Sequence, residues 1–83
     1  MMKQEIKRAL LDFICRNYMV EEHEFEMDKS LVDQGIIDSF GLVELSTHMT
    51  QTYGFTVEEN DMNRENFGSV EKMTAFIEKR ASA

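Results

Sequence analysis

A serine stands directly after an aspartate in the segment GIIDSF, residues 35–40, and Ser39 is the best candidate for chemistry in this chain. A small polar residue between an apolar loop and an amphipathic run commonly caps a helix. A serine hydroxyl at a helix start can also carry a covalently attached group, because the unpaired N–H groups and the helix dipole there favour a phosphate. Ser39 therefore has two interpretations, and its residue type and position alone favour the cap.

Catalysis by a side chain of this protein has little support in the sequence. A serine nucleophile needs a base and an orienting acid, and His48 is predicted to project away from Ser39 on the same helix. The single cysteine, Cys15, has no base nearby in the sequence and is interpreted as an inert thiol. We therefore expect no catalytic residue and no enzymatic activity.

A metal site is also not expected. One cysteine cannot build a structural zinc site, which needs several ligands. Asp61, Asn63 and Glu65 have the spacing of the start of a calcium loop. The required glycine position holds Asn66 and the position of the bidentate acid holds Lys72, so the motif fails.

Helical periodicity indicates the elements that must position Ser39. Apolar residues recur at helical spacing from about residue 3 to 18, forming a stripe that leaves Leu11 and Cys15 on the opposite side. A second helix is predicted from Asp38 or Ser39 to about Tyr53, ended near Gly54. A short helical turn is expected over residues 59–65, and Ser69 is predicted to cap a last helix. The expected fold is an all-α four-helix bundle with a short third helix.

Residues 19–37 are predicted to form a long loop that packs against the core through apolar side chains. These are Val20, Phe25, Met27, Leu31, Val32, Ile36 and Ile37. Long ordered loops of this kind are often functional. In the helix that follows, Leu42, Leu45 and Met49 are predicted to face the core. Phe40 and Val43 project from the other side beside Ser39, which indicates a contact surface.

Length and composition limit the remaining possibilities. Eighty-three residues predict one domain, 1–83, and 42% apolar residues are enough for it to fold. Residues 21–38 hold seven acids against one base within a net charge of −7, which opposes nucleic-acid binding and favours partners with basic surfaces. No apolar run approaches the roughly 20 residues of a membrane span, and no signal peptide is recognisable. A cytoplasmic monomer is expected.

The run LVDQGIIDSFGLVEL at residues 31–45 resembles the attachment motif of acyl carrier proteins. The resemblance covers nearly the whole chain, including the long loop, the Tyr53–Phe55 helix end and a short acidic third helix. It reverses the preference stated above for Ser39. It implies that a magnesium-dependent phosphopantetheinyl transferase moves 4′-phosphopantetheine from coenzyme A onto Ser39, and that the thiol of this arm holds cargo as a thioester.

The resemblance also implies partners and their contact residues. Asp38 would lie beside the attached cofactor, and Phe40, Val43 and Glu44 would contact acyl- or aminoacyl-activating and acyl-processing enzymes. The carrier itself would perform no bond chemistry. Leu42, Leu45 and Met49 would line the interior against which a cargo chain folds.

The cargo class is left open by the sequence. Carriers of primary fatty-acid synthesis usually have a strongly acidic second helix, whereas Gly41, Thr47, Thr50 and Gln51 occupy such positions here. The main expectation is a specialised acyl carrier of a fatty-acid, lipid or polyketide-type pathway. The first alternative is an aminoacyl or peptidyl carrier, because residues 36–40 are also similar to D-alanyl carriers. The alternative of another class is an unmodified helical adaptor.

Overall fold

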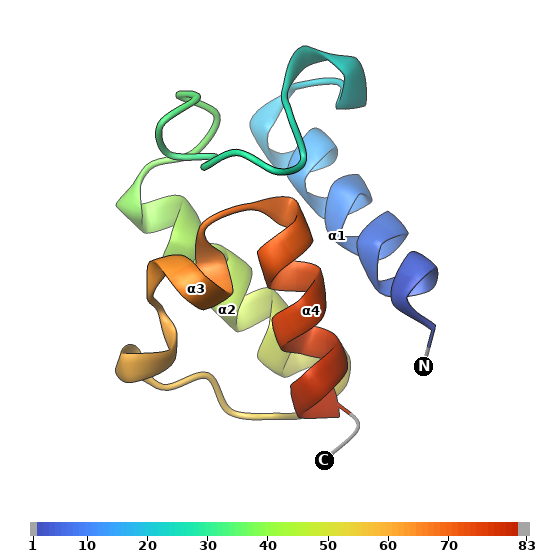
Figure 1. Ribbon diagram of the computed structural model, residues 1–83, viewed down its shortest axis with the longest axis vertical. Helices are drawn as coiled ribbons and strands as arrows, with labels where there is room; N and C mark the ends of the chain where they lie inside the picture. Colours follow the sequence, from blue (N-terminus) through green and yellow to red (C-terminus); the bar gives the residue numbers. More distant parts are fainter. Residues whose placement is uncertain (1, 82–83) are drawn as a thin grey trace.

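The computed structural model describes residues 2–81, and within them the fold is an all-α bundle (Figure 1). The α-helices are α1 (Lys3–Tyr18), α2 (Ser39–Tyr53), α3 (Arg64–Phe67) and α4 (Val70–Ala81), and two 3₁₀ turns are η1 (Glu22–Glu24) and η2 (Glu59–Asp61). The four-helix fold predicted from the sequence is confirmed. No helix in the described part of the chain is long and apolar enough to cross a bilayer.

Helix α4 forms the centre of the packing, since it contacts each of the other three α-helices. Its residue Ser69 lies just before the first turn, where its hydroxyl accepts a hydrogen bond from the Lys72 N–H at 3.1 Å, as predicted for a cap. The inward stripe of α4 is completely apolar except for Thr74, whose hydroxyl donates to the Val70 carbonyl at 2.8 Å. The buried apolar residues are Ile6, Leu10, Leu11, Ile14, Phe25, Leu31, Ile37, Leu45, Met49, Phe67, Val70, Met73, Phe76 and Ile77.

Helix α1 is buried on a wider face than its periodicity predicted. Leu11 was expected opposite the apolar stripe, yet it is buried. Ion pairs bring neighbouring segments to both sides of this part of α1: Lys7 binds Glu71 of α4, and Arg8 lies 3.4 Å from Glu22 of η1. Because the loop covers α1 here, a residue outside the main stripe is removed from water.

The long loop after α1 is tied to the bundle rather than free. Phe25, Leu31 and Ile37 are buried, and the backbone N–H of Glu71 donates to the Met27 carbonyl at 3.0 Å. Val32 is the exception to the predicted anchors, because it is exposed. It lies in a tight turn in which the Gly35 N–H donates to the Val32 carbonyl at 3.0 Å, and Gly35 has a φ of 76°. This turn directs Leu31 inward and Val32 outward.

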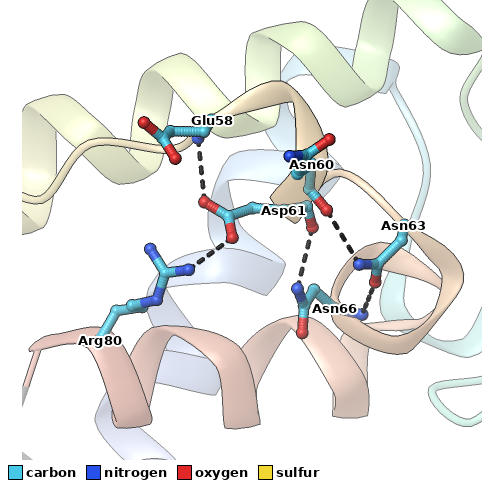
Figure 2. Close-up of polar contacts among 6 residues, drawn as sticks. All are labelled: Glu58, Asn60, Asp61, Asn63, Asn66 and Arg80. Atoms are coloured by element: carbon cyan, nitrogen blue, oxygen red, sulfur yellow. Dashed lines mark hydrogen bonds and ion pairs between the residues drawn. The ribbon is translucent and has the colours of Figure 1, made fainter.

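Asp61 connects α4 to the segment that carries α3 (Figure 2). Its carboxylate accepts from the Glu58 N–H at 3.0 Å and pairs with Arg80 of α4. The Glu58 N–H and Arg80 hold the pKa of this carboxyl below its ordinary value. Asn63 caps α3 by accepting from the Asn66 N–H at 3.0 Å. Asp61 and Asn63, two of the residues that resembled a calcium loop, therefore hold α3 in place.

Figure 1 shows how the bundle is oriented around these contacts. Helix α1 begins at the lower right of the view, α4 ends near the bottom, and the loop 19–38 crosses the top. The start of α2 lies beside this loop, so Ser39 follows directly on the segment 21–38, which holds seven of the sixteen acidic residues.

Candidate functional site

The start of α2 shows which residue is the cap. Asp38 has an extended backbone, and its Oδ1 accepts from the Gly41 N–H at 2.9 Å. Its carbonyl accepts the first helical bond, from the Leu42 N–H at 3.2 Å. Asp38 is therefore the N-cap and Ser39 is the first helical residue. Because another residue caps the helix, the exposed Ser39 hydroxyl is not needed for that role.

Neighbouring residues hold this helix start in place. Ile37 is buried just before the cap, and Leu42, half-buried, follows it inside the helix at the spacing of a hydrophobic staple. The far end of α2 is closed by Gly54, at φ 80°, whose N–H donates to the Thr50 carbonyl at 2.9 Å. The sequence predicted both ends of this helix, and both are confirmed.

Gln34 organises the loop that leads to the site, although no motif in the sequence marks it. Its side-chain amide donates to the carbonyls of Glu26 and Lys29 at 3.0 and 3.1 Å, and its Oε1 accepts from the Glu26 N–H at 2.7 Å. Such a glutamine is visible in the sequence only as a polar loop residue, because its bonds reach backbone groups five and eight residues away. It fixes the loop that immediately precedes Ser39.

The outer face of α2 carries two large apolar side chains in water. Phe40 is 77% exposed and Val43 is 54% exposed, as predicted from their position on the helix. Both lie within the first turns after Ser39. Two exposed apolar side chains three residues apart on one helix are typical of a binding face.

Glu44 borders this face and has a partner within the chain. The Tyr18 hydroxyl, at the end of α1, donates to Glu44 Oε1 at 2.9 Å and lies 3.5 Å from the Gly41 carbonyl. Burial and the hydrogen bond to Glu44 raise the pKa of Tyr18 to about 12, because both favour the neutral phenol. No local pattern indicates this contact, since the two residues are 26 positions apart.

Leu42, Leu45 and Met49 differ in how accessible they are to a cargo chain. Leu45 and Met49 are completely buried within the continuous core. Leu42 is half-buried and lines a groove of about 190 Å³ between the loop and α3, together with Val32, Met62, Arg64 and Phe67. Of the three residues expected to face cargo, Leu42 is the one that a molecule at the surface can reach.

The remaining candidates for chemistry lie elsewhere. His48 stacks on Phe13 of α1 with ring centroids 4.1 Å apart, and burial lowers its pKa. Cys15 is partly buried, and burial together with the acids of the loop raises the pKa of its thiol, which disfavours the reactive thiolate. Within residues 2–81, no three His, Cys, Asp or Glu side chains gather into a group able to hold a metal ion.

The fit of a covalently attached phosphate group to this site can be judged from the helix start. The hydroxyl of Ser39 is exposed and lies at the positive end of a 15-residue helix. The backbone N–H groups of a first helical turn have no acceptor within the helix. A phosphate ester at this position is therefore favoured electrostatically and meets no steric obstacle from the buried core.

Comparison with known proteins relates this site to a family. The family model described as "Phosphopantetheine attachment site" matches residues 8–77. The D-alanyl carrier protein of Abiotrophia defectiva is 29% identical over 75 residues, covering 90% of this chain and 91% of that protein. The D-alanyl carrier protein of Streptococcus suis (strain 05ZYH33) is 30% identical over 73 residues, covering 88% of this chain and 91% of that protein. An exposed serine at the start of α2 and a family match across the bundle lead to one conclusion: the chain belongs to the phosphopantetheine-binding carrier proteins, whose prosthetic group is 4′-phosphopantetheine.

Proposed function

We propose that Ser39 is the residue to which 4′-phosphopantetheine is attached. The observation that carries this proposal is the helix cap, in which Asp38 Oδ1 accepts a hydrogen bond from the Gly41 N–H at 2.9 Å. Because Asp38 satisfies the helix start, the Ser39 hydroxyl is left exposed and available to a transferase. Asp38 acts beside the cofactor by fixing the backbone that carries this hydroxyl, and the helix dipole favours the phosphate of the attached arm.

The cargo that we propose is an aminoacyl group. The two relatives described above are D-alanyl carrier proteins, and this supports the aminoacyl alternative over the acyl carrier that was the main expectation from the sequence. The packing of Leu45 and Met49 is consistent with a small cargo, because these residues are completely buried rather than lining an open chamber. When bound, the arm would supply the thiol that holds the aminoacyl group as a thioester.

The partners that we propose are a phosphopantetheinyl transferase and an aminoacyl-activating enzyme. Phe40 and Val43 would form the apolar part of the contact surface, with Glu44 at its edge. The acidic loop 19–38 borders the same end of the molecule and would steer basic partner surfaces toward Ser39. In this function the carrier presents its cargo, and the partner enzymes perform the chemistry.

The attachment residue is tested by weighing the protein after incubation with coenzyme A and a promiscuous transferase. We expect wild type to gain one phosphopantetheinyl mass and Ser39→Ala to gain none. Ser46→Ala is the matched control on the same helix, since the Ser46 hydroxyl donates to the Val43 carbonyl at 2.7 Å, and it should be modified like wild type. Wild type that stays unmodified with several transferases would instead support the adaptor function.

The cargo class is tested on the modified protein. We expect an amino-acid-activating enzyme with ATP and D-alanine to load the arm with a thioester that hydroxylamine cleaves. Loading by an acyl-activating enzyme with fatty acids, and none with amino acids, would restore the acyl-carrier interpretation.

A further inference from the structure

The contact between Tyr18 and the start of α2 has a geometry that bears on how Ser39 is presented. Tyr18 is the last residue of α1, and its hydroxyl reaches Glu44 Oε1 at 2.9 Å. The same hydroxyl lies 3.5 Å from the carbonyl oxygen of Gly41. Gly41 and Glu44 both belong to the first turns of the helix that begins at Ser39, so this one hydroxyl joins the two helices beside the attachment residue.

Gly41 makes this close approach possible. It is buried, and a Cβ atom added there would lie 2.9 Å from Ile37 Cβ and 3.1 Å from the Tyr18 hydroxyl oxygen. Any larger residue would therefore push Tyr18 or Ile37 away. The backbone at the start of α2 is thus held by the end of α1 on one side and by the buried Ile37 on the other.

The direction of the hydrogen bond is fixed over a wide pH range. Burial and Glu44 raise the pKa of Tyr18 to about 12, so the phenol remains a donor at neutral pH. The Glu44 carboxylate is accordingly the acceptor, and Tyr18 restricts it to one orientation although the residue is exposed. An exposed glutamate without such a contact samples several rotamers, and ordering it upon binding weakens an interface.

We propose that Tyr18 is a positioning residue: by holding Glu44 and the first turns of α2, it presents Ser39 and a preorganised carboxylate together to the basic surface of the enzyme that modifies Ser39. This inference rests on the proposed attachment to Ser39. Tyr18 itself does not touch the reacting atoms. It acts by restricting the motion of Glu44 before the partner binds. Its loss should therefore weaken docking and leave the rate of the transfer step unchanged.

The test compares Tyr18→Phe with Tyr53→Phe in phosphopantetheine transfer from coenzyme A, followed by mass. Both variants remove one hydroxyl from a half-buried tyrosine, but no hydrogen bond of the Tyr53 hydroxyl is found within residues 2–81. We expect Tyr18→Phe to raise the KM for the carrier about three- to tenfold, the effect of ordering one side chain on binding. We expect kcat to stay within about twofold, and Tyr53→Phe to match wild type.

A double variant separates positioning from general destabilisation. Glu44→Ala should also raise KM, and adding Tyr18→Phe to it should raise KM by less than Tyr18→Phe does alone, because the contact with Glu44 is already lost and only the one with the Gly41 carbonyl remains. Additive effects, or an unchanged KM in folded Tyr18→Phe, would overturn the proposal. If Tyr18→Phe does not fold, the Glu44→Ala variant decides by its KM: an unchanged KM refutes the positioning role.

A readout without any enzyme tests the contact itself. Tyr18 and Tyr53 are the two tyrosines of the chain, so in Tyr53→Phe the phenol absorbance reports Tyr18 alone. We expect it to titrate near 12, and adding Glu44→Ala should lower that pKa while burial keeps it above 10. An unchanged pKa would show that the two side chains are not bonded. Modification of Ser39→Ala would instead refute the attachment site, so the two failures are distinguishable.

Discussion

Substitutions of Asp38 separate its role as a helix cap from any role of its charge. Asp38→Ala removes the acceptor of the Gly41 N–H, and losing such a cap costs about 1 kcal/mol. For a domain of this size that corresponds to a fall of roughly 4–8 °C in Tm. Asp38→Asn keeps a side-chain oxygen at the cap and loses the interaction of the charge with the helix dipole, about 0.3–1 kcal/mol. We therefore expect its Tm to lie between those of wild type and Asp38→Ala.

The rate at which Ser39 is modified should depend on whether residue 38 caps the helix. A small domain with about 5 kcal/mol of stability that loses about 1 kcal/mol remains about 99% folded or more, so global unfolding cannot explain slower modification. We expect Asp38→Ala to be modified more slowly than wild type because its first helical turn frays, and Asp38→Asn to be modified nearly as fast as wild type. Asp28→Ala is the charge control, since Asp28 is an exposed acid of the same loop and caps no helix.

The assay combines thermal unfolding followed by circular dichroism with a time course of the mass gain. Two results would contradict the role of Asp38 as a cap. A Tm for Asp38→Ala equal to that of wild type would mean that the cap contributes nothing. Modification of Asp38→Asn as slow as that of Asp38→Ala, at a higher Tm, would mean that the transferase reads the negative charge directly.

Three further predictions concern the core, the pH dependence and the electrostatics. Leu45→Ala should lower the free energy of unfolding by about 2–5 kcal/mol, because Leu45 is completely buried, and an unchanged urea midpoint would contradict that burial. Asp61→Asn should be less stable than wild type at neutral pH. Since the folded pKa of Asp61 is lowered, wild type loses this advantage as the pH falls below the ordinary value of 3.8, and thermal unfolding at several pH values should show the two proteins converging. Association with the transferase, measured by stopped flow, should slow as ionic strength rises past about 0.1 M, where the Debye length is about 10 Å; a rate independent of salt would assign docking to Phe40 and Val43 instead.

The bounds of the three longer helices were predictable because their signals are local, whereas the turn predicted over residues 59–65 is divided between η2 (Glu59–Asp61) and α3 (Arg64–Phe67). The periodicity of residues 3–18 gave the bounds of α1, and Asp38 with Gly54 marked both ends of α2. The Ser69 cap marked the start of α4 in the same way. Each of these signals acts within one or two turns, so a single sequence contains all the information that is needed.

Contacts between distant residues were not predictable from the sequence. Leu11 is buried where η1 and α4 lie on either side of α1, as the Arg8–Glu22 and Lys7–Glu71 contacts show, and periodicity within one helix contains no information on such neighbours. Arg80 is 19 residues from Asp61, and Tyr18 is 26 residues from Glu44. The assignment of Ser39 as attachment residue remains a prediction, supported by its exposure and by the family match.

If Ser39 is the attachment residue, as proposed, the order of residues 37–41 meets two requirements that oppose each other. A modified hydroxyl must be accessible to an enzyme, yet its backbone must be held firmly enough to be recognised. Here the holding is done by Ile37 and Gly41, which are buried on either side, and by the Asp38 cap. Ser39 lies between them with none of these tasks. If Asp38 and Ser39 were exchanged, the charge and the cap would be preserved, but the serine hydroxyl would be the group that accepts from the Gly41 N–H. With the proposed attachment at Ser39, the order aspartate before serine suits the helix start, because the aspartate takes the cap and the hydroxyl stays available.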